Sequence, residues 1–204
     1  MMPTRSAIIQ DFERIHAARS AIMVYHYFDF RDVKKQDCYG LLSSLISQVS
    51  AGSDSFYQVF YQLYSNHAGG MQKPATNALT KCLKDMLSQP RQGPIFIVID
   101  GLDECPNSSG MPSVRSKVLE LIKELIGLQL PNVHLCVASR PELDIRNVLE
   151  SLNSLQISLH DEPGQEADII AYIKSFVKAN HAPGWTEADE NLVISTLSQN
   201  ANGM

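Results

Sequence analysis

Three carboxylates stand directly behind an apolar run of the sequence. The run is Ile95–Ile99, and Asp100, Asp103 and Glu104 follow it. A carboxylate that a buried strand delivers to the edge of an α/β sheet can hold Mg²⁺, and a second acid beside it can polarise a water molecule for attack on phosphate. The spacing therefore predicts a metal ligand at Asp100 and a catalytic acid at Asp103 or Glu104. The alternative is an acidic turn without chemistry, in which Gly101 only breaks the strand.

A second group of polar residues ends the next apolar strand. Val133–Ala138 is short and β-favouring, and Ser139 and Arg140 follow it. Parallel strands end at one edge of a sheet, so these side chains are expected beside the carboxylates. A guanidinium can pair with phosphate oxygens in a bidentate fork, and a serine can add a hydroxyl. Ser139 and Arg140 are therefore predicted to bind nucleotide phosphate. The alternative for Arg140 is an ion pair with Glu142 or Asp144 at the start of a helix.

The elements that must position these residues alternate along the chain. Apolar strands are predicted at residues 21–30, 95–99 and 133–138, with a weaker one at 155–159. Helical spacing of apolar residues predicts helices at 5–15, 42–49, 56–63, 79–87, 114–125 and 145–149. This alternation predicts an α/β fold with a parallel sheet and helices on both faces, over residues 1–159. Residues 160–204 show only helical patterns, including a capping-box pattern at Thr186 and Asp189, and are predicted to start a helical subdomain.

The composition narrows the classes of function. The 204 residues are 44% hydrophobic and 19% charged, with no apolar run of membrane-spanning length, which predicts a globular protein without a membrane partner. The net charge of −5, without a dense basic stripe, argues against nucleic acid as a partner. Four scattered cysteines predict reduced thiols and a cytoplasmic location. His26 lies in an aromatic strand and is predicted to be a packed or half-exposed strand residue rather than a ligand or base.

Four segments of the sequence carry a family resemblance. Residues 95–104, Ile-Phe-Ile-Val-Ile-Asp-Gly-Leu-Asp-Glu, resemble the Walker B motif of NACHT-type NTPases, which are members of the STAND class of signalling ATPases. Val24–Asp32 and Leu41–Gln48 resemble the second-strand region of fungal NACHT proteins with a nephrocystin-type N-terminal domain. Val133–Leu143 is similar to the sensor 1 strand of that family. The resemblance implies a P-loop NTPase-like fold in a fungal NLR-like protein, with ATP or ADP and Mg²⁺ as cofactors of a signalling switch.

The resemblance also implies roles, and one motif departs from it. By resemblance, Asp100 would hold Mg²⁺, Asp103 or Glu104 would activate water, and Arg140 would sense the terminal phosphate. No Gly-x-x-x-x-Gly-Lys-Ser/Thr occurs in the sequence. Arg5–Ile15 resembles the helix that follows this loop, so the chain is expected to start just after the Walker A loop and to lack the first strand. Because the P-loop supplies most phosphate contacts, we expect weak nucleotide binding and little or no ATPase activity from this chain alone.

Two other functions stay open. The first is a nucleotide-independent interaction or regulatory fragment that pairs through an exposed sheet edge, with a second copy or a NACHT-containing relative as its partner. The second is a metal-dependent nuclease that uses the three carboxylates, although the basic surface that phosphodiester substrates favour is lacking. Magnesium-dependent nucleotide binding that Asp100→Asn abolishes would support the NTPase hypothesis and contradict the interaction hypothesis.

Overall fold

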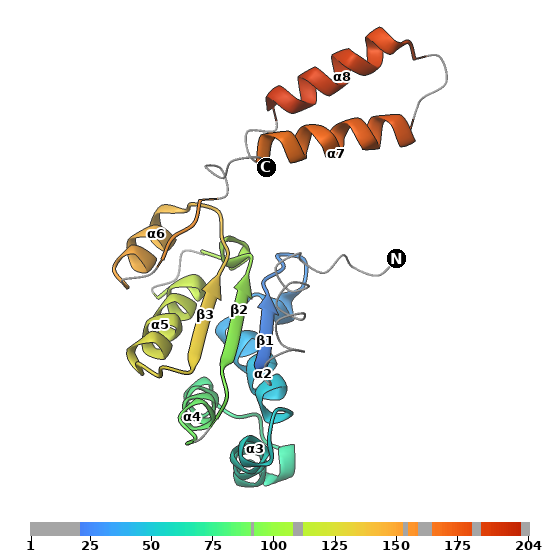
Figure 1. Ribbon diagram of the computed structural model, residues 1–204. Helices are drawn as coiled ribbons and strands as arrows, with labels where there is room; N and C mark the ends of the chain where they lie inside the picture. The colour runs from blue at the N-terminus through green and yellow to red at the C-terminus, as the bar shows by residue number, and fades with distance from the viewer. Residues whose placement is uncertain are drawn as a thin grey trace. The chain divides into compact units, whose positions relative to one another are not determined.

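The computed structural model describes residues 21–90, 92–107, 112–152, 155–158, 165–180 and 185–200 (Figure 1). The chain divides into two compact units, Met1–Asn153 and Ser154–Met204. The predicted domain boundary after residue 159 stays a prediction, because compactness alone does not test whether each part folds independently. The helix predicted at residues 5–15 lies outside the described residues.

Three parallel strands form the sheet of the first unit (Figure 1). They are β1 (Ile22–Tyr27), β2 (Ile95–Asp100) and β3 (Val133–Val137), hydrogen-bonded in the order β1-β2-β3. The strands are rich in β-branched and aromatic residues, which favour a pleated, partly buried backbone. Ile95 pairs with Ile22 on one side and with Val133 on the other, so the three strands start at one level. The predicted fold class, an α/β fold with a parallel sheet flanked by helices, is confirmed.

The helices of this unit alternate with the strands, as parallel connections require. The α-helices are α2 (Cys38–Ser50), α3 (Asp54–Asn66), α4 (Thr76–Leu87), α5 (Val114–Gly127) and α6 (Leu143–Glu150). Three short 3-10 segments are η1 (Val33–Lys35), η2 (Ala68–Gly70) and η3 (Leu102–Glu104). Side-chain caps fix several starts: Asp37 accepts a hydrogen bond from the backbone of α2, and Ser53 and Ser113 do the same for α3 and α5. The five predicted helices between residues 42 and 149 are therefore confirmed.

One face of the sheet packs into the apolar core. Side chains alternate along a strand, so Val24, Ile97 and Leu135, which are aligned in register, point to the same face. Val24 and Ile97 are fully buried in one cluster with apolar residues of α2, α4 and α5. Asp100 has the opposite parity to Ile97, so its side chain leaves β2 on the other face. The core thus fixes the strand without enclosing the carboxylate.

The edges of the sheet lie at β1 and β3. On β1, the Gln48 amide accepts a hydrogen bond from the Tyr25 N–H at 3.0 Å and donates one to the Tyr25 carbonyl at 2.7 Å. This side chain of α2 takes the place of a neighbouring strand and protects part of that edge. In the part of the chain that the structure describes, no strand pairs with the outer edge of β3.

The second unit contains α7 (Gln165–Ala179) and α8 (Glu187–Asn200), which pack against each other (Figure 1). A capping box starts α8, because the Thr186 hydroxyl accepts from the Asp189 N–H at 3.3 Å and the Asp189 carboxylate accepts from the Thr186 N–H at 2.8 Å. The predicted capping pattern is confirmed. None of the described helices in either unit is long and apolar enough to cross a bilayer.

The weak strand predicted at residues 155–159 is wrong for residues 155–158. These residues form no strand, and the Leu155 side chain is 89% exposed. A strand persists only where its backbone groups pair with a neighbour, and among the described residues no strand pairs with this segment. Residue 159 lies outside the described residues.

Candidate functional site

The carboxyl ends of the three strands bring the predicted site residues to one edge of the sheet. Asp100, the last residue of β2, pairs with Tyr27, the last residue of β1. The Ala138 N–H, just after β3, donates to the Ile99 carbonyl at 2.8 Å, and the Ala138 carbonyl accepts from the Leu102 N–H at 3.2 Å. The acidic segment and the Ser-Arg segment therefore lie side by side, as the strand order requires.

Gly101 makes the turn that aims the acids. Its φ of 68° and ψ of 36° lie in the left-handed region, and an added Cβ would lie 3.3 Å from the Phe28 carbonyl oxygen. Both conditions favour glycine. The turn leads directly into η3, where the Glu104 N–H donates to the Gly101 carbonyl at 2.8 Å. Asp103 and Glu104 are thereby folded back over the end of the sheet.

Asp103 is bonded to the segment that follows β3. Its Oδ1 accepts from the Arg140 N–H at 3.0 Å and from the Ser139 hydroxyl at 3.5 Å, and its Oδ2 lies 3.5 Å from Arg140 Nε. The Asp103 side chain is 13% exposed, whereas the Arg140 side chain is 82% exposed. One predicted catalytic acid and both predicted phosphate-binding residues therefore form one group, and the exposed guanidinium keeps donors available to solvent.

Glu104 turns toward the end of β1 instead. Its Oε2 accepts from the Phe30 N–H at 3.3 Å. This long bond to a neutral donor leaves the Glu104 carboxylate less engaged than that of Asp103, which faces a guanidinium and two further donors. Of the two predicted acids, Glu104 is the freer one to accept a proton or orient a water molecule.

Asp100 precedes these two acids in the sequence and is half-buried. Burial raises the pKa of Asp100 above its ordinary value, and the charge of Asp103 raises it further, while a hydrogen bond with the Gly101 backbone works in the opposite direction. A cation beside this carboxylate would offset both unfavourable effects. Among the described residues, no group of three or more His, Cys, Asp or Glu side chains forms a metal site. The donor set fits Mg²⁺, which commonly takes one or two carboxylates and completes its shell with water and phosphate oxygens.

Arg115 holds the acidic turn in place through hydrogen bonds to its backbone. Its role was not predicted from the sequence. This α5 residue is only 7% exposed. Its Nη2 donates to the Asp103 carbonyl at 2.7 Å, its Nε donates to the Cys105 carbonyl at 2.9 Å, and its Nη1 donates to the Asp144 carboxylate of α6 at 3.2 Å. A single guanidinium thus joins the middle of η3 and the residue that follows it to α6. The available signal was an arginine on the apolar face of a helix, three residues before Val118.

Burial suppresses the reactivity of one histidine and three cysteines in the core of the described residues. His26 is buried, which agrees with the packed alternative of the prediction, and burial lowers its pKa to about 4. Burial also raises the pKa of the Cys38 and Cys82 thiols to about 11 and that of Cys105 to about 12, so these thiols stay protonated and poorly nucleophilic. The carboxylates at the strand ends remain the best candidates.

A known protein family matches the part of the chain that contains this edge of the sheet. Residues 4–140 match the family model described as Nephrocystin 3, N-terminal. The matched range contains all five predicted site residues, from Asp100 to Arg140. No curated protein matches the chain.

Proposed function

Because the chain belongs to the family described as Nephrocystin 3, N-terminal, we propose that the acidic edge of its sheet is part of the ATP- and magnesium-binding site of a NACHT-type, STAND-class signalling NTPase. The observation that carries this proposal is the bonded group of Asp103, Ser139 and Arg140 beside Asp100. It joins a predicted catalytic acid and a predicted phosphate-binding cation across neighbouring strands, next to the predicted metal ligand, where α/β proteins bind nucleotides. A fungal NLR-like origin and a cytoplasmic location belong to the same proposal.

Each residue has a distinct part in the proposed site. Asp100 would hold Mg²⁺, which would neutralise charge on the phosphates. Glu104 would orient the attacking water, because its carboxylate is the less engaged of the two acids. Asp103 would position Arg140 and compete with phosphate for its guanidinium, so the ion pair would loosen when phosphate arrives. Arg140 would then contact the terminal phosphate through its exposed donors.

The affinity of this site is expected to be low. The sequence contains no Walker A motif, whose backbone amides, lysine and hydroxyl supply most phosphate contacts in such enzymes. Asp100 and Arg140 alone should bind ADP or ATP with a Kd of roughly 1 mM. We expect little or no hydrolysis by this chain alone.

Isothermal titration of the purified protein with ATP and ADP, with and without Mg²⁺, tests the proposal. We expect magnesium-dependent binding that Asp100→Asn abolishes. Asp85→Asn is the matched control, because Asp85 is an exposed acid of α4 whose ion-pair partner is the exposed Lys81. Absence of magnesium-dependent binding at about 10 mM nucleotide, roughly ten times the expected Kd, would rule the site out for this chain.

A nucleotide-independent interaction role is the second candidate. It is favoured by the outer edge of β3, which pairs with no strand among the described residues and could accept a strand from a second copy or from a NACHT-containing relative. Sedimentation velocity across a concentration series tests it. Self-association that needs no nucleotide and is unchanged in Asp100→Asn would support this role, whereas a monomer at every concentration would remove the second copy as a partner.

A further inference from the structure

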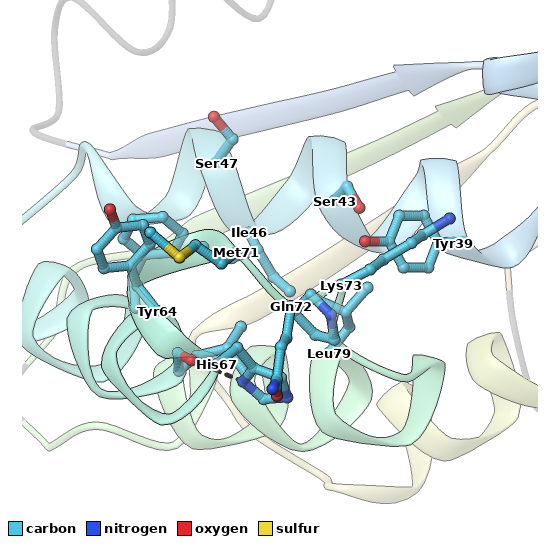
Figure 2. Close-up of a pocket in the computed structure, with 14 residues that line it drawn as sticks. Tyr39, Ser43, Ile46, Ser47, Tyr64, His67, Met71, Gln72, Lys73 and Leu79 are labelled. Carbon is cyan, nitrogen blue, oxygen red and sulfur yellow. Dashed lines mark hydrogen bonds between the residues drawn. The ribbon is translucent and has the colours of Figure 1, made fainter.

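A pocket of about 420 Å³ lies between α2, α3 and the segment that joins η2 to α4 (Figure 2). None of the five residues predicted for the nucleotide site lines it. α2 contributes Tyr39, Ser43 and Ile46, and the opposite wall includes Tyr64, His67 and Lys73. The volume falls in the range of small-molecule sites, roughly 300–1,000 Å³.

The wall opposite α2 is a tightly built turn. Ala68, Gly69 and Gly70 all have positive φ, at 52°, 63° and 86°. The His67 carbonyl accepts from both the Gly70 N–H and the Gln72 N–H at 3.1 Å, which fixes this unusual path. Gly70 lies so close to Tyr64 that an added Cβ would lie 2.7 Å from the ring. Glycine adopts positive φ freely, so only Ala68 is strained, and the two hydrogen bonds to the His67 carbonyl hold this turn without a ligand.

The pocket combines aromatic walls with polar groups that have no protein partner. In the described part of the chain, no hydrogen-bond partner is recorded for the side chains of Ser43, Ser47 and Gln72, which all line the pocket. The His67 Nδ1 lies 2.8 Å from the Leu63 carbonyl, which can only accept, so Nδ1 carries a proton and donates to this carbonyl. Apolar walls with a few convergent polar groups are the usual composition of a small-molecule site.

The charge of the pocket has one sign. The Lys73 ammonium lies 3.9 Å from the centroid of the Tyr39 ring, and Figure 2 shows the lysine side chain extending along this tyrosine. The residues that line the pocket, all from the described part of the chain, include no Asp or Glu. A ligand carboxylate near Lys73 would therefore meet a cation and hydroxyl donors without a competing acid.

We propose that this pocket binds a small molecule that joins an aromatic body to one carboxylate. The aromatic body would pack against Ile46 and Tyr64, and the carboxylate would pair with Lys73 beside the Ser43 hydroxyl. The proposal is independent of nucleotide binding, because the pocket shares no residue with the acidic edge of the sheet.

A matched pair of probes tests the proposal. 1-Naphthaleneacetate and 1-naphthaleneacetamide have nearly the same shape and differ in charge. In titrations followed by ¹H–¹⁵N spectra, we expect shifts centred on residues 39–47 and 64–73 and binding of the carboxylate about tenfold tighter than the amide. Lys73→Gln should reduce this preference to less than about twofold, because it removes the charge and keeps a polar side chain only one atom shorter. Lys81→Gln, an exposed lysine of α4 outside the pocket, should leave the preference unchanged.

Ser43→Leu supplies a second variant that fills the pocket without altering its charge. It should weaken both probes roughly tenfold, and the carboxylate more than the amide, because the hydroxyl donor beside Lys73 is lost as well. Three results would overturn the proposal: no saturable shifts in these residues at about 5 mM probe, equal binding of the two probes to the unaltered protein, or the same loss of preference in Lys81→Gln as in Lys73→Gln.

Discussion

The acidic edge of the sheet and the aromatic pocket lie in the same unit but differ in how far their polar groups are hydrogen-bonded within the protein. At the edge, nearly every charge is bonded to another group: Asp103 to Arg140, Glu104 to the Phe30 backbone, and Arg115 to two carbonyls and Asp144. At the pocket, hydroxyls and an amide face solvent beside aromatic rings. The acidic edge holds charges in fixed positions, and the pocket has hydrogen-bond donors that are available to a ligand.

This difference predicts different responses to mutation. A bonded network transmits the loss of one member to its partners, because each partner left buried and unpaired has lost its water as well. An open pocket should tolerate the loss of one polar side chain with little change in stability, since water replaces the missing contact. Stability should therefore be sensitive at the acidic edge, and ligand binding should be sensitive at the pocket.

Arg115→Ala should have the largest effect on stability. The substitution leaves the Asp103 and Cys105 carbonyls and the Asp144 carboxylate without their shared donor, at an expected cost of about 3 kcal/mol in the free energy of unfolding. Urea unfolding followed by circular dichroism measures this. Arg146→Ala is the control, because its ion pair with Glu150 is exposed and should contribute less than about 0.5 kcal/mol. A similarly small loss in the free energy of unfolding in both variants would mean that the hydrogen bonds of Arg115 do not stabilise the acidic edge.

The next largest effect on stability is expected at His26, when the pH is lowered. Unlike the charged groups of the acidic edge, its imidazole has a nitrogen without a hydrogen-bond partner among the described residues. Its Nε2 is buried with no hydrogen-bond partner among the described residues, and burial lowers its pKa from 6.5 to about 4. Between these pH values the unfolded chain binds a proton at His26 and the folded chain does not, so stability should fall as the pH falls from about 6.5 to about 4. The expected loss is about 2 kcal/mol, with allowance for partial solvation.

His26→Leu should remove that part of the pH dependence. Urea unfolding of the two proteins at several pH values between 7 and 4 makes the comparison. Other groups titrate in both proteins, so the informative quantity is the difference between the two curves. Parallel curves over this range would show that the His26 imidazole is solvated in the folded protein.

Glycines in the two regions allow a paired test with smaller effects. Gly101→Ala and Gly70→Ala both force a side chain into a left-handed conformation, with φ of 68° and 86°, and each should cost about 1–2 kcal/mol. Gly101→Ala should weaken magnesium-dependent nucleotide binding and leave naphthaleneacetate binding intact, and Gly70→Ala should do the reverse. Gly127→Ala is the control, because an added Cβ there meets nothing within 4 Å. If either variant disturbed both ligands, the two regions would not be independent.

How much of these regions the sequence predicts depends on how local the signal is. Asp100, Asp103 and Glu104 are contiguous with a strand, and strand order then places Ser139 and Arg140 beside them, so the acidic edge follows from the sequence. The choice of partners does not. Whether Asp103 or Glu104 faces Arg140 depends on the left-handed turn at Gly101, whose direction no spacing rule supplies.

Long-range contacts account for the rest of what the sequence does not show. Arg115 and Asp144 are 29 residues apart and meet only because the fold brings the first turn of α6 to the first turn of α5. The pocket is assembled from one face of α2 and a turn at residues 67–73, and none of its residues is unusual in its own segment. The error at residues 155–158 has the same origin, because apolar alternation predicts a strand but a strand requires a partner in space.

Asp100→Asn should have the smallest effect on stability and the opposite sign. A folded-state pKa raised by burial means that Asp100 favours folding below its ordinary pKa of 3.8 and that this contribution is lost as the pH rises. At pH 7 the neutral amide should therefore stabilise the protein by about 0.5 kcal/mol, after discounting for the solvent exposure of this side chain, and the gain should vanish at pH 3.

Adding Mg²⁺ and ADP should raise the melting temperature of the unaltered protein and not that of Asp100→Asn. A variant that is more stable and unable to bind is typical of a residue retained for function. If Asp100→Asn instead lowers stability as much as Asp103→Asn does, then Asp100 belongs to the bonded scaffold and the metal site must be sought elsewhere.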